Sequence, residues 1–127
     1  MFIGWDISGT SYDVAHVKWG ESWKMPTKTQ CEELLNNCNF EFTNINGTNV
    51  CKVTGKNGGV IFIPTSGAYM QITDKTELWG KNYVANFWSS SAETADGYSY
   101  YLYLSYDGTH ITPWSRATGL PVRPVKK

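Results

Sequence analysis

The apolar residues change their spacing once along the chain, close to Asn39, and this change constrains the fold more than any other feature. Before it, four side chains have the i, i+3, i+4 and i+7 spacing of one buried helix face: Cys31, Leu34, Leu35 and Cys38. After it, Phe40 and Phe42 alternate with polar residues, which is the period of a strand with one buried face. Helices followed by strands are the order of an α+β domain, which is the predicted fold class.

Two capping boxes predict where the helices begin. Thr10 stands three residues before Asp13, and Thr27 stands three residues before Gln30, so that side chain and backbone can exchange hydrogen bonds at each start. Gly20 supplies a stop for the first helix. The expected helices are Ser11 to Trp19 and Thr27 to about Asn37.

Turn residues divide the remaining chain into strands. Asn46-Gly47 and Asn57-Gly58-Gly59 separate the runs of a small antiparallel meander, and the Asp-Gly pair at 107–108 joins two later runs. The run Val60 to Ile63 is expected to be buried on both faces, and Thr65 to Lys81, which has no clean period, is expected to form a long loop. The later strands are expected at Asn82 to Ser90, Tyr98 to Ser105, His110 to Ser115 and Leu120 to Val125.

The 127 residues are enough for one domain, 1–127, with a single core. A formal net charge of zero gives no electrostatic signature for nucleic acid or for an anionic membrane. No stretch approaches the ~18 apolar residues of a membrane span, and the first residues lack the pattern of a signal peptide. We therefore expect no nucleic-acid partner and no membrane insertion. The core is expected to contain Val14, Val17, Leu34, Leu35, Phe40, Ile61, Ile63, Phe87, Leu102 and Leu104.

The cysteines bear on disulfides, metals and catalysis. Cys31 and Cys38 are seven residues apart on the expected second helix, which separates their Cα atoms by ~10.5 Å, beyond the ~7 Å limit of a disulfide. A bridge between Cys38 and Cys51 is geometrically open, but three is an odd number and three free thiols are the expectation. Neither zinc-ligand spacing nor a Ser/His/Asp or paired-carboxylate arrangement is evident, so we expect no metal, no cofactor and no enzymatic activity.

The stretch Asp96 to Thr118 holds five of the eight tyrosines, mixed with Ser, Thr, Gly and Asp and without Lys or Glu. This mixture is typical of recognition surfaces, because Tyr offers a large ring with few rotors and the small polar residues adapt their hydrogen bonds. An aromatic hairpin whose rings pack across strands for stability has the same composition. Composition alone leaves both interpretations open.

Strand alternation predicts which of these side chains face outward. Leu102 and Leu104 share one face of their strand, with Ile111 as the inward residue across the hairpin, so that Tyr101 and Tyr103 point away from the core. The predicted exposed patch contains Tyr101, Tyr103, Tyr106, His110, Thr112 and Trp114, with Ser105 pointing the same way and Asp96, Tyr98 and Ser115 at the rim. These are the candidate ligand-binding residues.

Five motifs, taken in order, resemble one protein family. They are DISGTSYDVAHVKWGESWKMPT, ELLNNCNFEFT, VTGKNGGVIFIP, NFWSSS and SRATGLPVRPV, spread from about Asp6 to Val125. Together they closely resemble the major paralogous domain named from Fibrobacter succinogenes, which is abundant in gut Bacteroidetes. The resemblance implies a C-type lectin-like fold, with two helices packed on a mostly antiparallel twisted sheet with long loops. It also implies a binding surface between Trp88-Ser89-Ser90 and Arg116.

Members of that family are similar to the variable proteins of diversity-generating retroelements, in which replacement of template adenines diversifies a C-terminal ligand-binding surface. Asparagine codons changed only at adenines cannot give Lys, Glu, Gln, Met or Trp. From Ala95 to Gly119 only Trp114 is of these types, where about five would be expected from the composition of the chain. The resemblance therefore implies a non-catalytic binding module with a variable region at about 89–119. Its partner would be a protein or glycan ligand, and its place a bacterial cell surface or a phage particle.

Two other functions are compatible with the same resemblance. A structural or assembly domain of a bacterial surface or phage protein would share the fold and bind nothing variable. Formylglycine-generating enzymes share the lectin-like fold but use cysteines late in the chain, and no cysteine here follows Cys51. The Glu-Pro-Asn or Gln-Pro-Asp loop of calcium lectins has no counterpart either, so calcium-dependent sugar binding is not expected.

Overall fold

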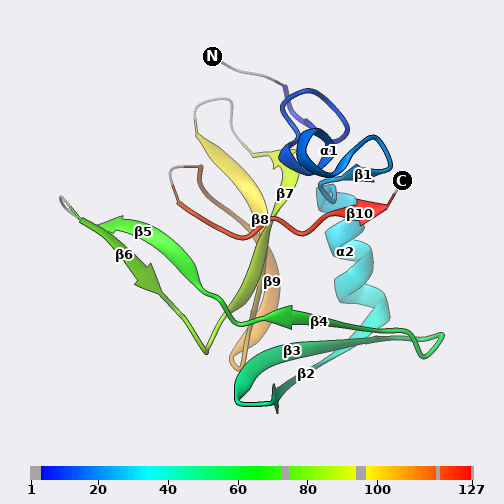
Figure 1. Cartoon of the computed structure of the whole chain (residues 1–127), viewed down its shortest axis with the longest axis vertical. Coiled ribbons are helices and arrows are strands. Elements are labelled where there is room, and N and C mark those ends of the chain that lie inside the picture. Colours follow the sequence, from blue (N-terminus) through cyan, green and yellow to red (C-terminus); the bar gives the residue numbers. More distant parts are fainter. Residues whose placement is uncertain (1–3, 73–74, 94–96, 117, 127) are drawn as a thin grey trace.

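The computed structural model describes residues 4–72, 75–93, 97–116 and 118–126. Within these ranges it is a small mixed α/β domain in which every strand pair is antiparallel. The elements are α1 (Val14–Trp19), β1 (Trp23–Lys24), α2 (Lys28–Asn37), β2 (Cys38–Ile45), β3 (Thr48–Gly55), β4 (Val60–Pro64), β5 (Ala68–Ile72), β6 (Lys75–Trp79), β7 (Ala85–Ala92), β8 (Tyr98–Ser105), β9 (Gly108–Ser115) and β10 (Val125–Lys126) (Figure 1). They form the three-stranded sheets β2–β3–β4 and β7–β8–β9 and the two-stranded pairs β5–β6 and β1–β10.

Helix α2 begins where the sequence predicts and buries the predicted stripe. The Thr27 hydroxyl oxygen accepts a hydrogen bond from the Gln30 backbone N–H at 3.1 Å, and the Gln30 side chain accepts one from the Thr27 backbone N–H at 3.0 Å. These bonds satisfy N–H groups that have no partner within the helix. The stripe faces the sheets, with Cys31 fully buried and Leu34, Leu35 and Cys38 partly buried. The predicted capping box and helix face are confirmed.

Helix α1 begins at Val14, three residues after the predicted start, because its cap is Asp13 rather than Thr10. The Asp13 carboxylate is fully buried and accepts hydrogen bonds of 2.8 to 3.1 Å from four backbone N–H groups, those of Gly9, Ala15, His16 and Met25. Burial alone would raise the pKa of Asp13, but these hydrogen bonds favour the charged form and lower the pKa below its usual value. Asp13 therefore joins the N-terminal loop, α1 and the end of β1.

Strands β2, β3 and β4 form the predicted meander, but the burial of β4 differs from the prediction. Asn46 and Gly47 have φ angles of 51° and 87°, as a tight two-residue turn between β2 and β3 requires. β4 is an edge strand. Of the run predicted to be buried on both faces only Ile63 is buried, and the other three residues are more than a third exposed. An apolar run does not by itself reveal how many layers cover a strand.

The segment Thr65 to Lys81, predicted to be a loop, contains the β5–β6 hairpin, which projects from the body of the domain (Figure 1). At its base, Gly67 has a φ of 70°, and a Cβ there would lie 2.1 Å from the carbonyl oxygen of Trp79. Only glycine fits this close approach. The hairpin is joined to the C-terminal segment by reciprocal backbone hydrogen bonds of 2.8 Å between Tyr69 and Gly119.

The C-terminal segment is irregular, as its two prolines predicted, but it forms less strand than expected. Of the expected strand Leu120 to Val125, only Val125 pairs, as part of β10 with β1. Pro121 and Pro124 have no N–H to donate to a sheet. The carbonyl oxygen of Pro121 instead accepts a hydrogen bond of 3.1 Å from the Trp88 backbone N–H, which ties the segment to β7 at this point.

The hydrophobic core lies where α2 packs on the two three-stranded sheets. It contains Cys31, Cys51, Val53, Ile63, Ala85, Phe87, Leu102 and Leu104. Four predicted core residues are thus confirmed, and three more pack against the edge of the core: Leu34, Leu35 and Phe40. The predictions for Val14, Val17 and Ile61 are wrong, because these side chains are exposed. Helix α1 is only six residues long and buries only Ala15.

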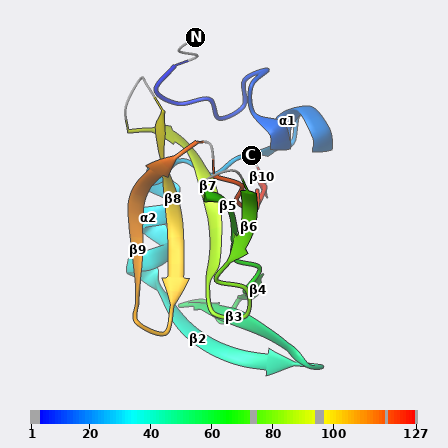
Figure 2. The ribbon, with the colours of Figure 1, turned by 90° about the vertical axis from the view of Figure 1, so that its left-hand side faces the viewer.

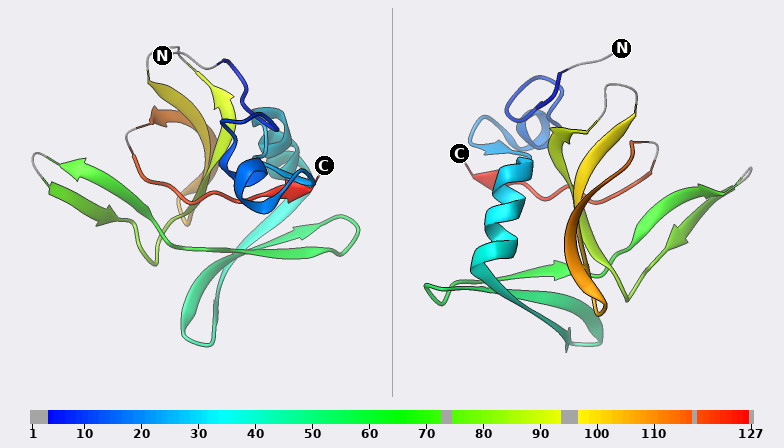
Figure 3. Two further views of the ribbon diagram at one scale, coloured as in Figure 1. Left: turned by 45° about the horizontal axis from the view of Figure 1, so that its top comes forward. Right: turned by 180° about the vertical axis from the view of Figure 1, so that it is seen from behind.

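The two sides of the β7–β8–β9 sheet have different surroundings. Helix α2 lies against one side, whereas the β5–β6 hairpin stands on the other (Figures 2 and 3). We call the side opposite α2 the helix-free face.

Candidate functional site

The helix-free face collects side chains that the sequence predicts to share one side of the Tyr-rich hairpin. Leu102 and Leu104 lie in the core beneath α2, so the alternation of β8 turns Tyr101 and Tyr103 to the other side. Cross-strand pairing adds three residues of β9 to this face: His110, Thr112 and Trp114. The predicted sidedness of the hairpin is confirmed.

Six rings contact one another on the helix-free face, and we call them the aromatic face: Trp79, Trp88, Tyr101, Tyr103, His110 and Trp114. The ring centroid of Tyr101 is 5.1 Å from that of Trp114 and 6.0 Å from that of Trp88. Tyr103 lies 6.2 Å from Tyr101 and stacks on His110 at 5.2 Å, with 4° between the planes. Trp79 meets Trp114 edge-on at 6.1 Å. Such pairs stabilise by ~0.5 to 1.5 kcal/mol beyond the burial of their area, so the rings order one another.

Tyr101 and Ser105 are buried, contrary to the predicted exposed patch. Tyr101 is only 7% exposed, because Trp88 and Trp114 close over it from the neighbouring strands. Burial raises the pKa of Tyr101 to about 12. Ser105 ends β8, where its hydroxyl oxygen accepts a hydrogen bond of 3.2 Å from the Asp107 backbone N–H. Both residues support the face from within.

Three further predicted residues do not join the aromatic face. The register places Tyr98 and Ser115 opposite each other, on the same side of the sheet as Tyr100. The ring of Tyr100 lies 4.4 Å from the Lys28 ammonium of α2, which makes this the helix side. The predicted rim position of Tyr98 and Ser115 is therefore wrong. Asp96 lies outside the described residues.

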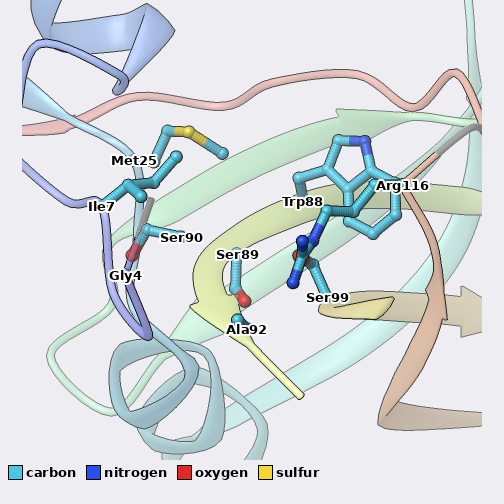
Figure 4. Close-up of a pocket in the computed structure, with 9 residues that line it drawn as sticks. All are labelled: Gly4, Ile7, Met25, Trp88, Ser89, Ser90, Ala92, Ser99 and Arg116. Carbon is cyan, nitrogen blue, oxygen red and sulfur yellow. The ribbon is translucent and has the colours of Figure 1, made fainter. Parts of the chain in front are cut away.

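A pocket of about 170 Å³ opens at the end of the β7–β8–β9 sheet nearest to residues 4–7, and we call it the upper pocket (Figure 4). Its lining includes Trp88, Ser89, Ser90, Ser99 and Arg116. These residues come from β7, from β8 and from the segment that follows β9. The upper pocket lies between the two motifs that the family resemblance points to.

Hydrogen bonds fix the polar groups of the upper pocket. The Ser90 hydroxyl donates to the Asp6 carboxylate at 2.7 Å, which ties the N-terminal segment to β7. The Arg116 guanidinium donates to the Ser99 hydroxyl at 2.8 Å and to a backbone carbonyl of β8 at 3.1 Å. The pocket thus combines a positively charged group, hydroxyl groups and the indole of Trp88 (Figure 4).

A pocket of about 380 Å³ lies at the other end of the helix-free face, between the base of the β5–β6 hairpin and the turn after β8. We call it the lower pocket. Four aromatic side chains and one carboxylate line it, with Gly80, Val84 and Ser105: Trp79, Tyr83, Tyr103, Tyr106 and Asp107. Tyr103 and Tyr106 were predicted as site residues but Trp79 and Tyr83 were not, because Trp79 fell in the expected loop Thr65 to Lys81 and Tyr83 in the expected strand Asn82 to Ser90. Trp79 and Tyr83, which lie close to Gly80 in the sequence, were the feature from which this end of the site could have been predicted.

The three cysteines do not line either pocket. In the ranges that the structure describes, no three His, Cys, Asp or Glu side chains are placed to hold a metal ion. The three cysteines are free thiols, and burial raises the pKa of Cys31 to about 12 and that of Cys51 to about 11. Both thiols therefore stay protonated at neutral pH. No helix in the described part of the chain is long and apolar enough to cross a membrane.

The chain was compared with known protein families, curated proteins and solved structures. No family model, no curated protein and no solved structure matches the chain.

Proposed function

We propose that the chain is a non-catalytic ligand-binding module whose recognition surface is the aromatic face with the pockets at its two ends. One observation carries the proposal. Tyr103 and Trp114 stay half-buried and His110 stays exposed, whereas α2 seals the opposite side of the same sheet. Ordered aromatic rings with one side in water bind partners at a small cost in side-chain entropy.

The proposal includes a C-type lectin-like fold and a diversified surface, as in the variable proteins of diversity-generating retroelements. This part of the proposal is supported by the position of three of the family-like motifs, which come together at the upper pocket. Ser90, from the fourth motif, is hydrogen-bonded to Asp6, which opens the first motif, and Arg116, from the fifth, lines the same pocket. The ligand would then be a protein or glycan on a cell surface, and the carrier a gut bacterium or its phage.

Flanking DNA tests the diversified surface. We expect a reverse transcriptase gene beside a near-copy of the segment that codes for Ser89 to Val125, with differences confined to adenines of the template. A flanking region that holds neither would contradict diversification.

Probe arrays test the binding function itself. We expect the protein to bind at least one probe on an array of glycans and bacterial surface proteins, and Trp114→Ala to weaken that binding about 30-fold, or ~2 kcal/mol. Trp19→Ala is the matched control, because Trp19 is exposed on α1, away from the aromatic face. Equal losses in the two variants would contradict the proposed surface.

An assembly domain is the second candidate, and one observation favours it. Four large apolar side chains in and before α1 are more than half exposed: Trp5, Tyr12, Val17 and Trp19. Exposed apolar patches commonly mark protein contacts. Analytical ultracentrifugation of the protein and of Val17→Asp tests this candidate, because an assembly through α1 would dissociate in the variant whereas a monomeric binding module would sediment identically in both.

A further inference from the structure

The lower pocket is lined by electron-rich groups. Trp79, Tyr83, Tyr103 and Tyr106 contribute rings and Asp107 a carboxylate, and its lining contains no basic side chain among the described residues. Its volume of about 380 Å³ exceeds the roughly 150 Å³ of a cavity that holds benzene. We infer that the lower pocket binds a quaternary ammonium group. This inference rests on the proposed function and deepens it, because it gives one end of the recognition surface a ligand class.

Three of the four rings are held in place by another ring outside the pocket. Tyr106 packs on Phe42 of β2, with ring centroids 4.5 Å apart. Tyr103 stacks on His110, and Trp79 meets Trp114. A ligand that enters the pocket therefore has few side-chain rotors to freeze, which is the main saving that a preorganised site offers.

The chemistry of these groups selects a cation. The face of an aromatic ring carries negative electrostatic potential, and a cation within about 6 Å of the centroid is attracted to it, most strongly by Trp and then by Tyr. Asp107 adds a formal negative charge to the same wall. A neutral ligand of the same shape would gain the apolar contacts but neither of these attractions.

The aromatic character of this wall favours a quaternary cation over a primary one. A primary ammonium has three N–H groups that need acceptors in suitable directions after leaving water, and the carboxylate and the hydroxyl groups of the lining must supply all three. A quaternary ammonium has no N–H groups and loses no hydrogen bonds on entry. Aromatic rings around a cation of this type are the usual means by which proteins recognise it.

Titration of the intact protein with three small probes tests the inference. Choline carries the quaternary cation, 3,3-dimethylbutan-1-ol is its uncharged isostere, and ethanolamine carries a primary ammonium. In NMR spectra we expect choline to shift the Trp79 indole N–H and the Asp107 amide saturably, with an affinity about tenfold or more above that of either other probe. Equal affinity for choline and its isostere, or no saturable shift with choline, would overturn the inference.

Matched substitutions locate the site. Tyr106→Leu keeps an apolar side chain but removes a ring, and should weaken choline binding about fivefold to tenfold, whereas Tyr106→Phe should retain it. Asp107→Asn should also weaken it. Tyr12→Leu is the control, since Tyr12 is exposed and does not line the pocket. If Tyr106→Leu and Tyr106→Phe bind choline equally well, the ring does not make the contact and the inference fails.

Two further probes distinguish the sources of such a cation. Tighter binding of phosphocholine than of a trimethyl-lysine peptide would assign a lipid or polymer headgroup, and the reverse order would assign a protein, with the cation recognised in both cases. The quaternary-ammonium ligand and the broader recognition surface can be contradicted independently of each other. Loss of choline selectivity while Trp114-dependent probe binding persists would overturn only the ligand class. Choline binding without any Trp114-dependent probe binding would overturn only the broader surface.

Discussion

The two faces of the β7–β8–β9 sheet use alternating residues of the same strands but are held in different ways. On the helix side, Phe87, Leu102 and Leu104 are buried against the core. On the helix-free face only Tyr101 of the six rings is buried, and the others remain partly in water. The difference indicates that burial secures one face, whereas ring contacts order the other. Side chains of the helix-free face can therefore be substituted with less loss of fold stability than those of the helix side.

The largest effect is expected from truncating the helix side. Leu102→Ala removes a fully buried side chain and leaves a cavity, so it should lower the free energy of unfolding by ~2 to 5 kcal/mol, measured by urea denaturation. Val17→Ala is the control and should change it by less than about 0.5 kcal/mol, because Val17 is exposed. A loss below about half a kcal/mol for Leu102→Ala would mean that the two faces are assigned the wrong way round.

Asp13 stabilises the fold from a position outside both faces of the sheet, through the four backbone N–H groups that donate to its carboxylate. Because its pKa is lowered on folding, its contribution is complete above the unfolded pKa of about 4 and is lost as the pH falls through the folded pKa. Asp13→Asn replaces the carboxylate facing four N–H groups and should cost roughly 1 to 3 kcal/mol at pH 7.

The pH dependence checks this assignment. The difference in unfolding free energy between Asp13→Asn and the parent protein should shrink as the pH is lowered from 6 to about 2. Glu21→Gln, at an exposed turn position, should show no comparable gap. A gap for Asp13→Asn that is constant with pH would show that its hydrogen bonds do not depend on its charge.

Thiol chemistry probes the helix side without any substitution. Cys31 and Cys51 are buried in the core and have raised pKa values, so in the native protein at pH 8 they should react with a disulfide reagent at least about a hundredfold more slowly than half-buried Cys38. In denaturant all three should be titrated without prior reduction. Recovery of only one thiol there would reveal a disulfide.

Features encoded by neighbouring residues could be predicted from the sequence. The capping box of Thr27 and Gln30 and the alternation of Leu102 and Leu104 each depend on residues within a few positions of one another. By contrast, the cap of α1 depends on Asp13, whose carboxylate also accepts from Met25 twelve residues later. Local spacing therefore placed that helix start three residues too early.

The rest of the site depends on contacts between distant segments. Tyr101 is buried because rings from β7 and β9 cover it, although its own strand pattern predicts an outward side chain. The lower pocket needs the β5–β6 hairpin, which has no periodic signature, to bring Trp79 into the same lining as Tyr103. Alternation could predict which side a residue occupies, but not what covers it.

The free energy of unfolding of Tyr103→Ala, compared with that of Leu102→Ala, tests the central claim most directly. Leu102 and Tyr103 are adjacent residues of β8, and their side chains point to opposite faces of the sheet. If the helix-free face is a recognition surface, Tyr103→Ala should cost no more than the ~1 to 2 kcal/mol of its ring contacts, while Leu102→Ala costs ~2 to 5 kcal/mol. Comparable losses would contradict the account and show that the rings are there to hold the hairpin together.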